Sequence, residues 1–365
     1  MKNIVVVFTC NNSINTFGGI KTILDSYAQQ ESVFESFGYK LFFFNYKPNL
    51  VGKYGAVGHV FYGIRQVMAL RKYLKKMDCN AVHIHTSRDF LFLKDILLGK
   101  MVKKSRRLPV LMTVHVGSAE TVFSKTKRFR DSLIRLHNKY INKTFFLSKS
   151  IQKEFVKLGF DEDKTLVLYN FHNLAPASKD KFITDDKILR LIYVGAVHRD
   201  KGVLDLLYGL KTINNIPYHL DICGSLKDET IKDEFEALLN EMRDTVTMNG
   251  IVNGSAKTDL YMQSDILVLP SYHEGLPMVI LEALKTGCAI ISTRVGATPE
   301  ILSDENAYWI DVKAPDQIRN AIEYFHSQKQ CLDKMKRNNE KLAERFSINN
   351  HIDELCKVYN TVIIK

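Results

Sequence analysis

Short runs of apolar, often β-branched residues alternate with longer helical patterns along nearly the whole of this 365-residue chain. Such runs are typical of strands that are buried on both faces, and strands that alternate with helices predict parallel βαβ units. In the first half the pattern predicts strands at 4–9, 40–45, 81–85, 110–114, 143–148 and 166–169, with helices at 20–32, 60–77, 91–102 and 150–158. This half therefore predicts a doubly wound α/β domain.

The same rhythm restarts after residues 171–188, a polar stretch without periodicity that we interpret as a linker. Here the predicted strands are 191–194, 219–223, 245–248, 266–269 and 289–292, the helices between them are 202–212, 227–242, 255–263 and 276–286, and three further helices follow at 315–328, 331–345 and 348–363. The length also favours two domains. Open α/β sheets bind ligands at the carboxyl ends of their strands, so we expect a site in a cleft between the domains.

The net charge of +11 is concentrated in the first half of the chain. Residues 1–170 contain 28 Lys or Arg and 12 Asp or Glu, whereas residues 171–365 contain 23 and 28. A basic half suggests nucleic acid, an anionic membrane surface or a phosphorylated substrate as partner, or else a solvated face without one. The basic clusters are Lys100, Lys103, Lys104, Arg106 and Arg107, then Lys125, Lys127, Arg128, Arg130 and Arg135. Few aromatic residues interleave with them, which disfavours nucleic acid and favours an anionic bilayer.

Other patterns narrow the class of protein. No apolar run reaches 18 residues, so no membrane-spanning helix is expected, and the first run is too short for the core of a signal peptide. The six cysteines form no C-x-x-C pair, which favours free thiols in a reducing cytosol. Without a G-x-x-x-x-G-K-[ST] motif or a G-x-G-x-x-G turn after a strand, an ATPase of the P-loop class and a dehydrogenase are disfavoured. The single tryptophan, Trp309, lies in an apolar run and is expected in the core.

The most informative stretch is 265–301, where a strand ends at Leu269 and a helix is expected to begin near Leu276 or Pro277. Proline suits a first helical turn, and the free N–H groups of a helix N-terminus suit a phosphate. Glu274 precedes this helix and Glu282 follows eight residues later, within it. A carboxylate accepts hydrogen bonds from vicinal hydroxyls, so the pair predicts contacts to a sugar and a ribose, unless both are solvated surface residues.

This stretch closely resembles the signature of glycosyltransferase family 4, retaining enzymes with the GT-B fold. Glu274 and Glu282 match the family's E-x7-E motif, and the flanking pattern D-I-x-V-x-P-S-x-x-E-G-x-P-x-x-x-x-E-A-x-x-x-G is matched almost throughout. The resemblance implies two doubly wound Rossmann-like domains that face a central cleft, with a C-terminal helix crossing back to the first. The implied boundaries are 1–170 for an acceptor-side domain with 346–365 packed on it, 171–188 for the linker and 189–345 for the nucleotide-sugar-binding domain.

Further segments resemble the family in the expected order. In the second domain, Lys201 matches the lysine that neutralises the donor diphosphate, and Arg199 could supply the charge of the family's arginine, whose position is occupied by Ala196. Gly224 resembles part of a G-x-G loop at a strand end, and Gly250 resembles the loop near the nucleotide base. In the first domain, the Gly18-Gly19 pair resembles the glycine-rich turn after strand one, and His115 matches the histidine of a T-x-H motif on the acceptor side.

The resemblance implies a retaining, metal-independent hexosyltransferase without a cofactor. Its donor would be a nucleoside-diphosphate sugar, UDP-linked by preference, and its acceptor a glycan or a lipid-linked glycan of bacterial surface polysaccharide biosynthesis. The implied donor-side residues are Gly18, Gly19, Arg199, Lys201, Gly224, Gly250, Glu274, Gly275, Leu276, Pro277 and Glu282, and the implied catalytic residues are Glu274, His115 and Lys201. Glu274 would hold the transferred sugar and Glu282 the ribose.

Several alternatives stay open at this point. A sugar-nucleotide epimerase of the GT-B fold would use the same donor without an acceptor, and a donor-binding scaffold would bind without turnover. A zinc site built from His83, His85 and His115 lacks supporting Cys or Asp spacing, so no metal is expected. We expect a cytoplasmic protein that lies at the inner face of the plasma membrane through its basic first domain and binds no nucleic acid.

Overall fold

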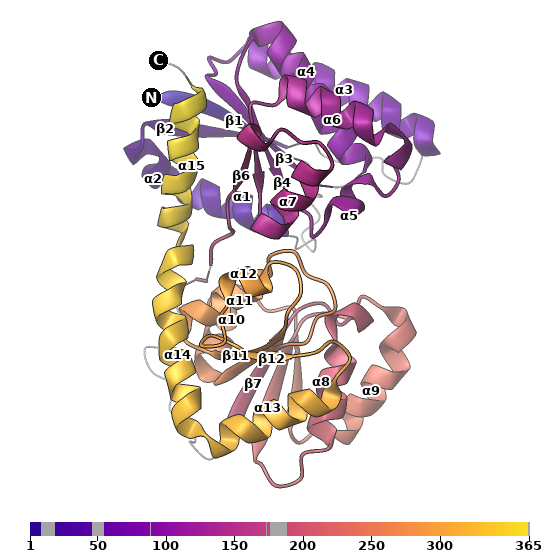
Figure 1. The fold of residues 1–365 in the computed structure, drawn as a ribbon, viewed down its shortest axis with the longest axis vertical. Helices are drawn as coiled ribbons and strands as arrows, with labels where there is room; N and C mark the ends of the chain where they lie inside the picture. Colours follow the sequence, from indigo (N-terminus) through magenta and orange to yellow (C-terminus); the bar gives the residue numbers. More distant parts are fainter. Residues whose placement is uncertain (9–18, 46–54, 88, 173, 176–187, 364–365) are drawn as a thin grey trace. The chain divides into compact units, whose positions relative to one another are not determined.

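The computed structural model describes residues 1–8, 19–45, 55–87, 89–172, 174–175 and 188–363 (Figure 1). The chain divides into two compact units. Unit 1 comprises Met1–Asn170 and Ile348–Lys365, and unit 2 comprises Phe171–Ser347. Each unit contains a six-stranded parallel sheet with its own helices, which confirms the α/β fold class. Most of the expected linker lies outside the described residues.

The sheet of unit 1 has the strand order β2-β1-β3-β4-β5-β6. Its strands are β1 (Lys2–Phe8), β2 (Tyr39–Asn45), β3 (Ala81–Thr86), β4 (Val110–Val114), β5 (Lys143–Phe146) and β6 (Thr165–Val167). Four successive residues of β1, Ile4 to Val7, are completely buried. This burial on both faces explains why β1 reads as an unbroken apolar run rather than an alternating one. The strand order reverses beside β1, where ligands of such sheets bind.

Eight α-helices belong to the described part of unit 1. They are α1 (Gly19–Gln29), α2 (Glu31–Ser36), α3 (Gly55–Lys75), α4 (Phe90–Arg106), α5 (Ala119–Phe123), α6 (Arg130–Tyr140), α7 (Lys149–Lys157) and α15 (Ile348–Val362), with short 3-10 turns at η1 (Lys127–Phe129) and η2 (Glu162–Lys164). The helix expected at 20–32 is divided in two because Gln30 leaves the helical region, with φ −104° and ψ 29°. None of the helices in the described residues is long and apolar enough to cross a membrane.

The last helix, α15, is joined to unit 1 by buried polar contacts. The Tyr359 hydroxyl lies 2.7 Å from Nδ1 of His83, and the other nitrogen of His83 lies 2.8 Å from the hydroxyl of Thr113. His351 donates from Nδ1 to the carbonyl of Tyr169, so its Nε2 must accept the hydrogen bond from the Tyr27 hydroxyl. These contacts connect the C-terminal helix to β3, β4 and α1.

The sheet of unit 2 has the strand order β12-β11-β10-β7-β8-β9. Its strands are β7 (Leu189–Val194), β8 (Tyr218–Cys223), β9 (Val246–Gly250), β10 (Ile266–Leu269), β11 (Ala289–Thr293) and β12 (Tyr308–Ile310). Its helices are α8 (Val203–Lys211), α9 (Lys232–Glu241), α10 (Gly254–Gln263), α11 (Met278–Lys285), α12 (Thr298–Ile301), α13 (Pro315–Ser327) and α14 (Lys329–Ala343), with 3-10 turns at η3 (Arg199–Lys201), η4 (Glu229–Ile231) and η5 (Glu344–Phe346). The order reverses at the β7/β10 pair, which makes this the switch point of the sheet.

The expectation that Trp309 lies in the core is wrong. Trp309 lies on β12 and is only partly buried. Its indole N–H donates to Asp304 Oδ1 at 2.8 Å, and the Arg294 guanidinium covers the ring at 4.3 Å. A tryptophan can therefore occupy an apolar run and still use its polar edge at the surface.

Burial perturbs the histidines that hold α15. Loss of hydration lowers the pKa of His83 to about 3 and that of His351 to about 4. In the unfolded chain the histidine pKa values are about 6.5. Below that pH the unfolded histidines bind protons while those of the folded unit stay neutral. The stabilisation from these neutral histidines is therefore complete above pH about 6.5 and is lost as the pH falls toward the lower folded values.

We expect the stability of unit 1 to fall by about 1.4 kcal/mol per pH unit for each such histidine between pH about 6.5 and 4.5. His351→Gln removes one titrating group and should reduce this slope. Hydrogen exchange of amides in β3 and α15 at a series of pH values measures it for unit 1 alone. His326→Gln on α13 of unit 2 is the matched control. An unchanged slope in His351→Gln would contradict the assignment.

Candidate active site

The carboxyl ends of the strands of unit 2 gather the residues expected on the donor side. Lys201 lies in η3 after β7, Gly224 follows β8, Gly250 ends β9, and Glu274 follows β10. Because all of these strands are parallel, their carboxyl ends meet at one edge of the sheet. Positions that lie up to 73 residues apart in the sequence thus come together.

Lys201 and Glu274 form an ion pair at this edge. Nζ of Lys201 donates to Oε1 of Glu274 at 2.7 Å, and the two side chains are 32% and 10% exposed. The loops that carry them are bonded through their backbones, because the amide of Tyr272 donates to the carbonyl of Asp200 at 2.8 Å. The cation and the carboxylate are therefore held by two loops that fix one another.

Two glycines allow these loops to pack closely. Gly202 has φ +67°, and a Cβ at this position would overlap the carbonyl of Pro270. Gly296, in the loop after β11, has φ +57°, and its Cβ would overlap the carbonyl of Glu274. A left-handed backbone and a close approach both require glycine. The position of the Glu274 backbone thus depends on a glycine that contacts it from the loop after a third strand, β11.

Glu282 lies inside unit 2, not on its surface. Only 2% of the residue is exposed. Its Oε1 accepts from Nζ of Lys257 at 2.5 Å and its Oε2 accepts from the Tyr261 hydroxyl at 3.0 Å. The alternative of a solvated surface glutamate is therefore wrong for this residue. A carboxylate has about four acceptor positions, so the two bonds leave further ones for a ligand hydroxyl.

Lys257 is a site residue that sequence reasoning missed. It lies on α10, and its side chain is 22% exposed. Burial raises the pKa of the Cys223 thiol to about 12, and the Lys257 charge acts against that rise, which places the ammonium near the carboxyl end of β8. On the sequence, a lone lysine in a short helix cannot be distinguished from a surface residue, because its partner Glu282 is 25 positions away.

The loop before α11 differs slightly from the expectation. The helix begins at Met278, one or two residues later than expected, and Pro277 is its N-cap with an extended backbone. Leu276 is buried, and the carbonyl of Gly275 accepts from the Ala297 amide at 2.8 Å. The segment is therefore anchored, and the first amides of α11 lie directly after Glu274, where a helix N-terminus favours negative charge.

Arg199 lies near the carboxylates of α8 and α9. Its Nη2 is 3.8 Å from Oε2 of Glu234 on α9, and its side chain is 50% exposed. Burial raises the pKa of Asp205, and the Arg199 charge acts against that rise, so the guanidinium is near α8 as well. Its assignment to the donor diphosphate in place of Ala196 remains a prediction.

In unit 1, His115 follows the carboxyl end of β4. Its Nε2 lies 2.9 Å from Nδ1 of His85, and the two rings are stacked with centroids 5.1 Å apart. Burial lowers the pKa of His115 to about 3 and holds that of His85 well below its usual range, so both imidazoles are neutral. Gly18 lies outside the described residues, and Gly19 is the first residue of α1. Within the described part of the chain, no three His, Cys, Asp or Glu side chains are grouped so as to hold a metal ion.

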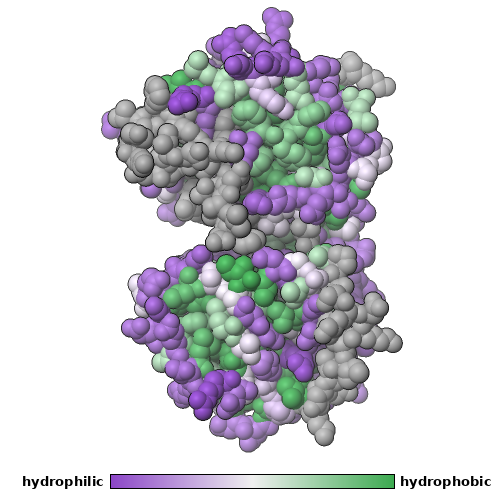
Figure 2. Space-filling view, turned by 180° about the vertical axis from the view of Figure 1, so that it is seen from behind, coloured by the Kyte–Doolittle hydropathy of each residue, from purple (hydrophilic) through white to green (hydrophobic). Residues whose placement is uncertain are grey.

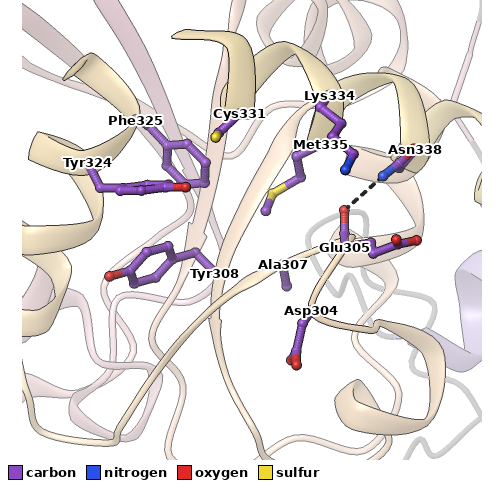
Figure 3. Close-up of a pocket in the computed structure, with 10 residues that line it drawn as sticks. All are labelled: Asp304, Glu305, Ala307, Tyr308, Tyr324, Phe325, Cys331, Lys334, Met335 and Asn338. Atoms are coloured by element: carbon purple, nitrogen blue, oxygen red, sulfur yellow. Dashed lines mark hydrogen bonds between the residues drawn. The ribbon is translucent and has the colours of Figure 1, made fainter. Parts of the chain in front are cut away.

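A cavity of about 240 Å³ lies elsewhere in unit 2, beside β12, α13 and α14 (Figure 3). Tyr308 and Tyr324 form one side of it, and Asn338 donates to the carbonyl of Glu305 at 3.4 Å on the other. It contains none of the residues expected at the active site. Its volume is also below the usual range of ligand pockets, about 300–1,000 Å³, so the sheet edge is the better candidate.

Two doubly wound units and a last helix that belongs to the first unit match the GT-B architecture that the sequence motifs imply. Comparison with protein families agrees. The family model described as Glycosyl transferases group 1 matches residues 176–342, and the model described as Glycosyltransferase Family 4 matches residues 46–175. The chain belongs to glycosyltransferase family 4, as its sequence motifs predict.

Individual relatives are distant but cover much of the chain. A glycosyltransferase of Methanocaldococcus jannaschii is 26% identical over 72% of this chain and 72% of its own length. The UDP-Gal:α-D-GlcNAc-diphosphoundecaprenol α-1,3-galactosyltransferase of Escherichia coli is 25% identical over 82% and 80%. The capsular polysaccharide biosynthesis glycosyltransferase CapM of Staphylococcus aureus is 25% identical over 56% and 55%. The fold is similar to that of Anabaena HepE, solved in complex with UDP, with a TM-score of 0.72, 14% identity and coverage of 99% and 100%.

The ion pair between Lys257 on α10 and the buried Glu282 on α11 leads to a prediction about the stability of unit 2. We expect Lys257→Met to lower the free energy of unfolding of unit 2 by about 3 kcal/mol, because Glu282 loses its counter-ion in a buried position. The double variant Lys257→Met/Glu282→Gln should recover most of this loss, since a neutral amide needs no counter-ion. Urea unfolding measures both.

The matched control is Lys211→Met, which breaks an ion pair to Glu241 whose side chains are 43% and 52% exposed. Exposed pairs contribute about 0–1 kcal/mol, so this variant should change little. If Lys257→Met costs no more than Lys211→Met, the buried pair is not a stabilising contact.

Proposed function

We propose that this chain transfers a hexosyl group from a UDP-sugar to a glycan or lipid-linked acceptor of bacterial surface polysaccharide biosynthesis, with retention at the anomeric carbon. The observation that carries the proposal is the Lys201–Glu274 ion pair at the carboxyl edge of the unit 2 sheet. UDP in the complex of Anabaena HepE supports the donor class, and the diphosphoundecaprenol acceptor and UDP-Gal donor named for the E. coli relative support both substrates.

The ion pair suits a substrate that carries its own charges and hydroxyls. The ammonium of Lys201 and the first amides of α11 would bind the donor diphosphate. Hydroxyls of the sugar would donate hydrogen bonds to the carboxylate of Glu274. Positive charge near the leaving diphosphate stabilises the charge that grows on it in the transition state. We assign this neutralisation to protein groups, without a metal ion or cofactor. Glu282 would accept hydrogen bonds from the ribose.

We propose that the acceptor attacks from the face on which the diphosphate leaves. The bond from the acceptor oxygen to the anomeric carbon forms as the bond to the phosphate oxygen breaks, and the acceptor proton passes to that phosphate oxygen. Glu274 steadies the positive charge that develops at the anomeric carbon. His115, whose Nε2 lies 2.9 Å from Nδ1 of His85, would shape the acceptor side together with Gly18 and Gly19.

We further propose that unit 1 works at the cytoplasmic face of the plasma membrane. The C-terminal turn of α4 contains Lys103, Lys104 and Arg106, and Arg107 follows it. Lys104, Arg106 and Arg107 are exposed, whereas Lys103 donates to Oδ1 of Asn142 at 3.0 Å. Each basic residue near an anionic surface contributes about 1 kcal/mol of attraction.

The function is tested by incubating the purified protein with a panel of UDP-sugars and diphosphate-linked lipid acceptors. We expect a glycosylated lipid whose new bond keeps the anomeric configuration of the donor, as read by nuclear magnetic resonance. Epimerised donor without transfer would instead show an epimerase. Binding of UDP-sugar without any product across the panel would show a scaffold.

Glu274→Gln should not weaken UDP binding and should lower turnover by about a hundredfold or more. Its carboxylate meets the sugar, which UDP lacks, and its charge acts chiefly in the transition state. Calorimetry with UDP and initial rates with the true acceptor separate the two effects. Glu323→Gln, on an exposed position of α13, is the control. Normal turnover in Glu274→Gln would remove this residue from the catalytic group.

Glu282→Gln should weaken UDP binding about ten- to a hundredfold, because the ribose hydroxyls lose an ionised acceptor. The amide is nearly isosteric, so Tyr261 keeps an oxygen to which it can donate. Calorimetry with UDP and GDP measures the loss, and a melting curve shows that the variant is folded. Unchanged affinity for both nucleotides would disprove the contact to the ribose.

A further inference from the structure

Large apolar side chains are exposed on one helical layer of unit 1. Met68 is 65% exposed and Ile64 53% on α3, Phe90 is 53% and Leu97 40% on α4, and Phe129 is 62% exposed in η1. Single exposed apolar residues are ordinary, but several on neighbouring elements mark an interaction surface. Figure 2 shows hydrophobic and hydrophilic side chains of unit 1 next to each other on the face in view.

The packing of the helices places these residues on a common surface. Residues of α3, α4 and α6 share one hydrophobic core with the sheet, and α4 contacts both α3 and α6. Ile64 and Met68 are four residues apart and therefore lie on the same face of α3. Phe90 begins α4, and Phe129 directly precedes α6. We call Ile64, Met68, Phe90, Leu97 and Phe129 the apolar face.

The apolar face extends toward the carboxyl edge of the unit 1 sheet. In parallel α/β units the helices run opposite to the strands, so helix N-termini lie at the carboxyl edge of the sheet. Phe90 and Phe129 are at N-terminal ends and thus lie toward the edge at which His115 follows β4. The basic residues of α3 and α4, including Lys72, Lys75 and those of 103–107, are at the C-terminal ends.

Basic residues are abundant in the part of the chain that carries the apolar face. Residues 64–140 contain 18 Lys or Arg and 5 Asp or Glu. Two of the five carboxylates, Asp89 and Asp95, are buried. Phe129 stands between Arg128 and Arg130, both on the surface, in the sequence Lys-Arg-Phe-Arg. An exposed aromatic ring among cations is suited to the boundary between acyl chains and anionic headgroups.

We propose that the apolar face inserts into the headgroup region of an anionic bilayer while the flanking lysines and arginines hold its headgroups. The inference deepens the membrane contact of the proposed function, from attraction at the surface to insertion of named side chains. Three of the five side chains of the apolar face, Ile64, Met68 and Leu97, have no aromatic ring on which a nucleic-acid base could stack, which disfavours that partner. A second copy of the chain would bring like charges together.

Insertion explains how a lipid-linked acceptor would reach the site. The apolar side chains extend toward the carboxyl edge of the unit 1 sheet, where His115 lies. A bilayer that covers this end of the helical layer would therefore present its lipid diphosphates beside the acceptor side of unit 1.

The test is sedimentation with phosphatidylcholine vesicles, with and without phosphatidylglycerol, at low and high salt. Wild-type protein should bind anionic vesicles, and part of this binding should persist at high salt, because apolar burial is not screened. The double variant Leu97→Ser/Phe129→Ser should reduce the partition coefficient about ten- to a hundredfold at both salt concentrations. Charge reversal of Lys104, Arg106 and Arg107 to Glu should reduce binding chiefly at low salt.

Val312→Ser, at a residue of unit 2 that is 43% exposed, is the matched control and should bind vesicles like the wild type. A second measurement uses Phe129→Trp, whose emission above that of Trp309 should shift to the blue with anionic vesicles only. The proposal is overturned if Leu97→Ser/Phe129→Ser pellets like the wild type, or if the protein binds single-stranded nucleic acid but no vesicle. UDP calorimetry on the same samples tests the proposed function separately, because failure to bind UDP would not affect the vesicle result.

Discussion

The hydrogen bond from the amide of Tyr272 to the carbonyl of Asp200 joins the loops that follow β7 and β10, and the candidate active site depends on it. It brings Lys201 and Glu274 within 2.7 Å, although they lie on different loops. The close approach of Gly202 to Pro270 completes the junction. The side-chain chemistry of the site is thus set by the backbones of two loops, which the parallel sheet brings to one edge.

Much of the fold could be predicted because parallel strands buried on both faces leave a strong apolar signal. The runs that became β1, β7 and β10 were visible as continuous apolar segments, and their alternation with helices indicated two doubly wound sheets. The sequence also indicated that Glu274 precedes α11 and that Glu282 lies within it, because the start of a helix leaves a local signal. Weaker elements were missed: α6 is a basic helix with few apolar residues, and β12 is an edge strand of three residues.

The parts of the site that could not be predicted are contacts over long sequence separations. Lys257 meets Glu282 because α10 and α11 pack together, and no local pattern marks a lysine that will face a buried carboxylate. The pairing of His85 with His115 depends on the register of β3 against β4. Residue types and spacing indicate which groups are present, whereas packing decides which of them touch.

On the proposed function, the Lys201–Glu274 pair has a role after transfer as well as before it. A bound UDP-sugar supplies partners for both side chains, so the pair can separate without leaving either charge alone. Once the sugar has gone to the acceptor, UDP still attracts the ammonium, but nothing is left to hydrogen-bond the carboxylate. Glu274 then competes with the spent diphosphate for Lys201, and re-formation of the pair favours departure of the product. One short ion pair would thereby limit product inhibition.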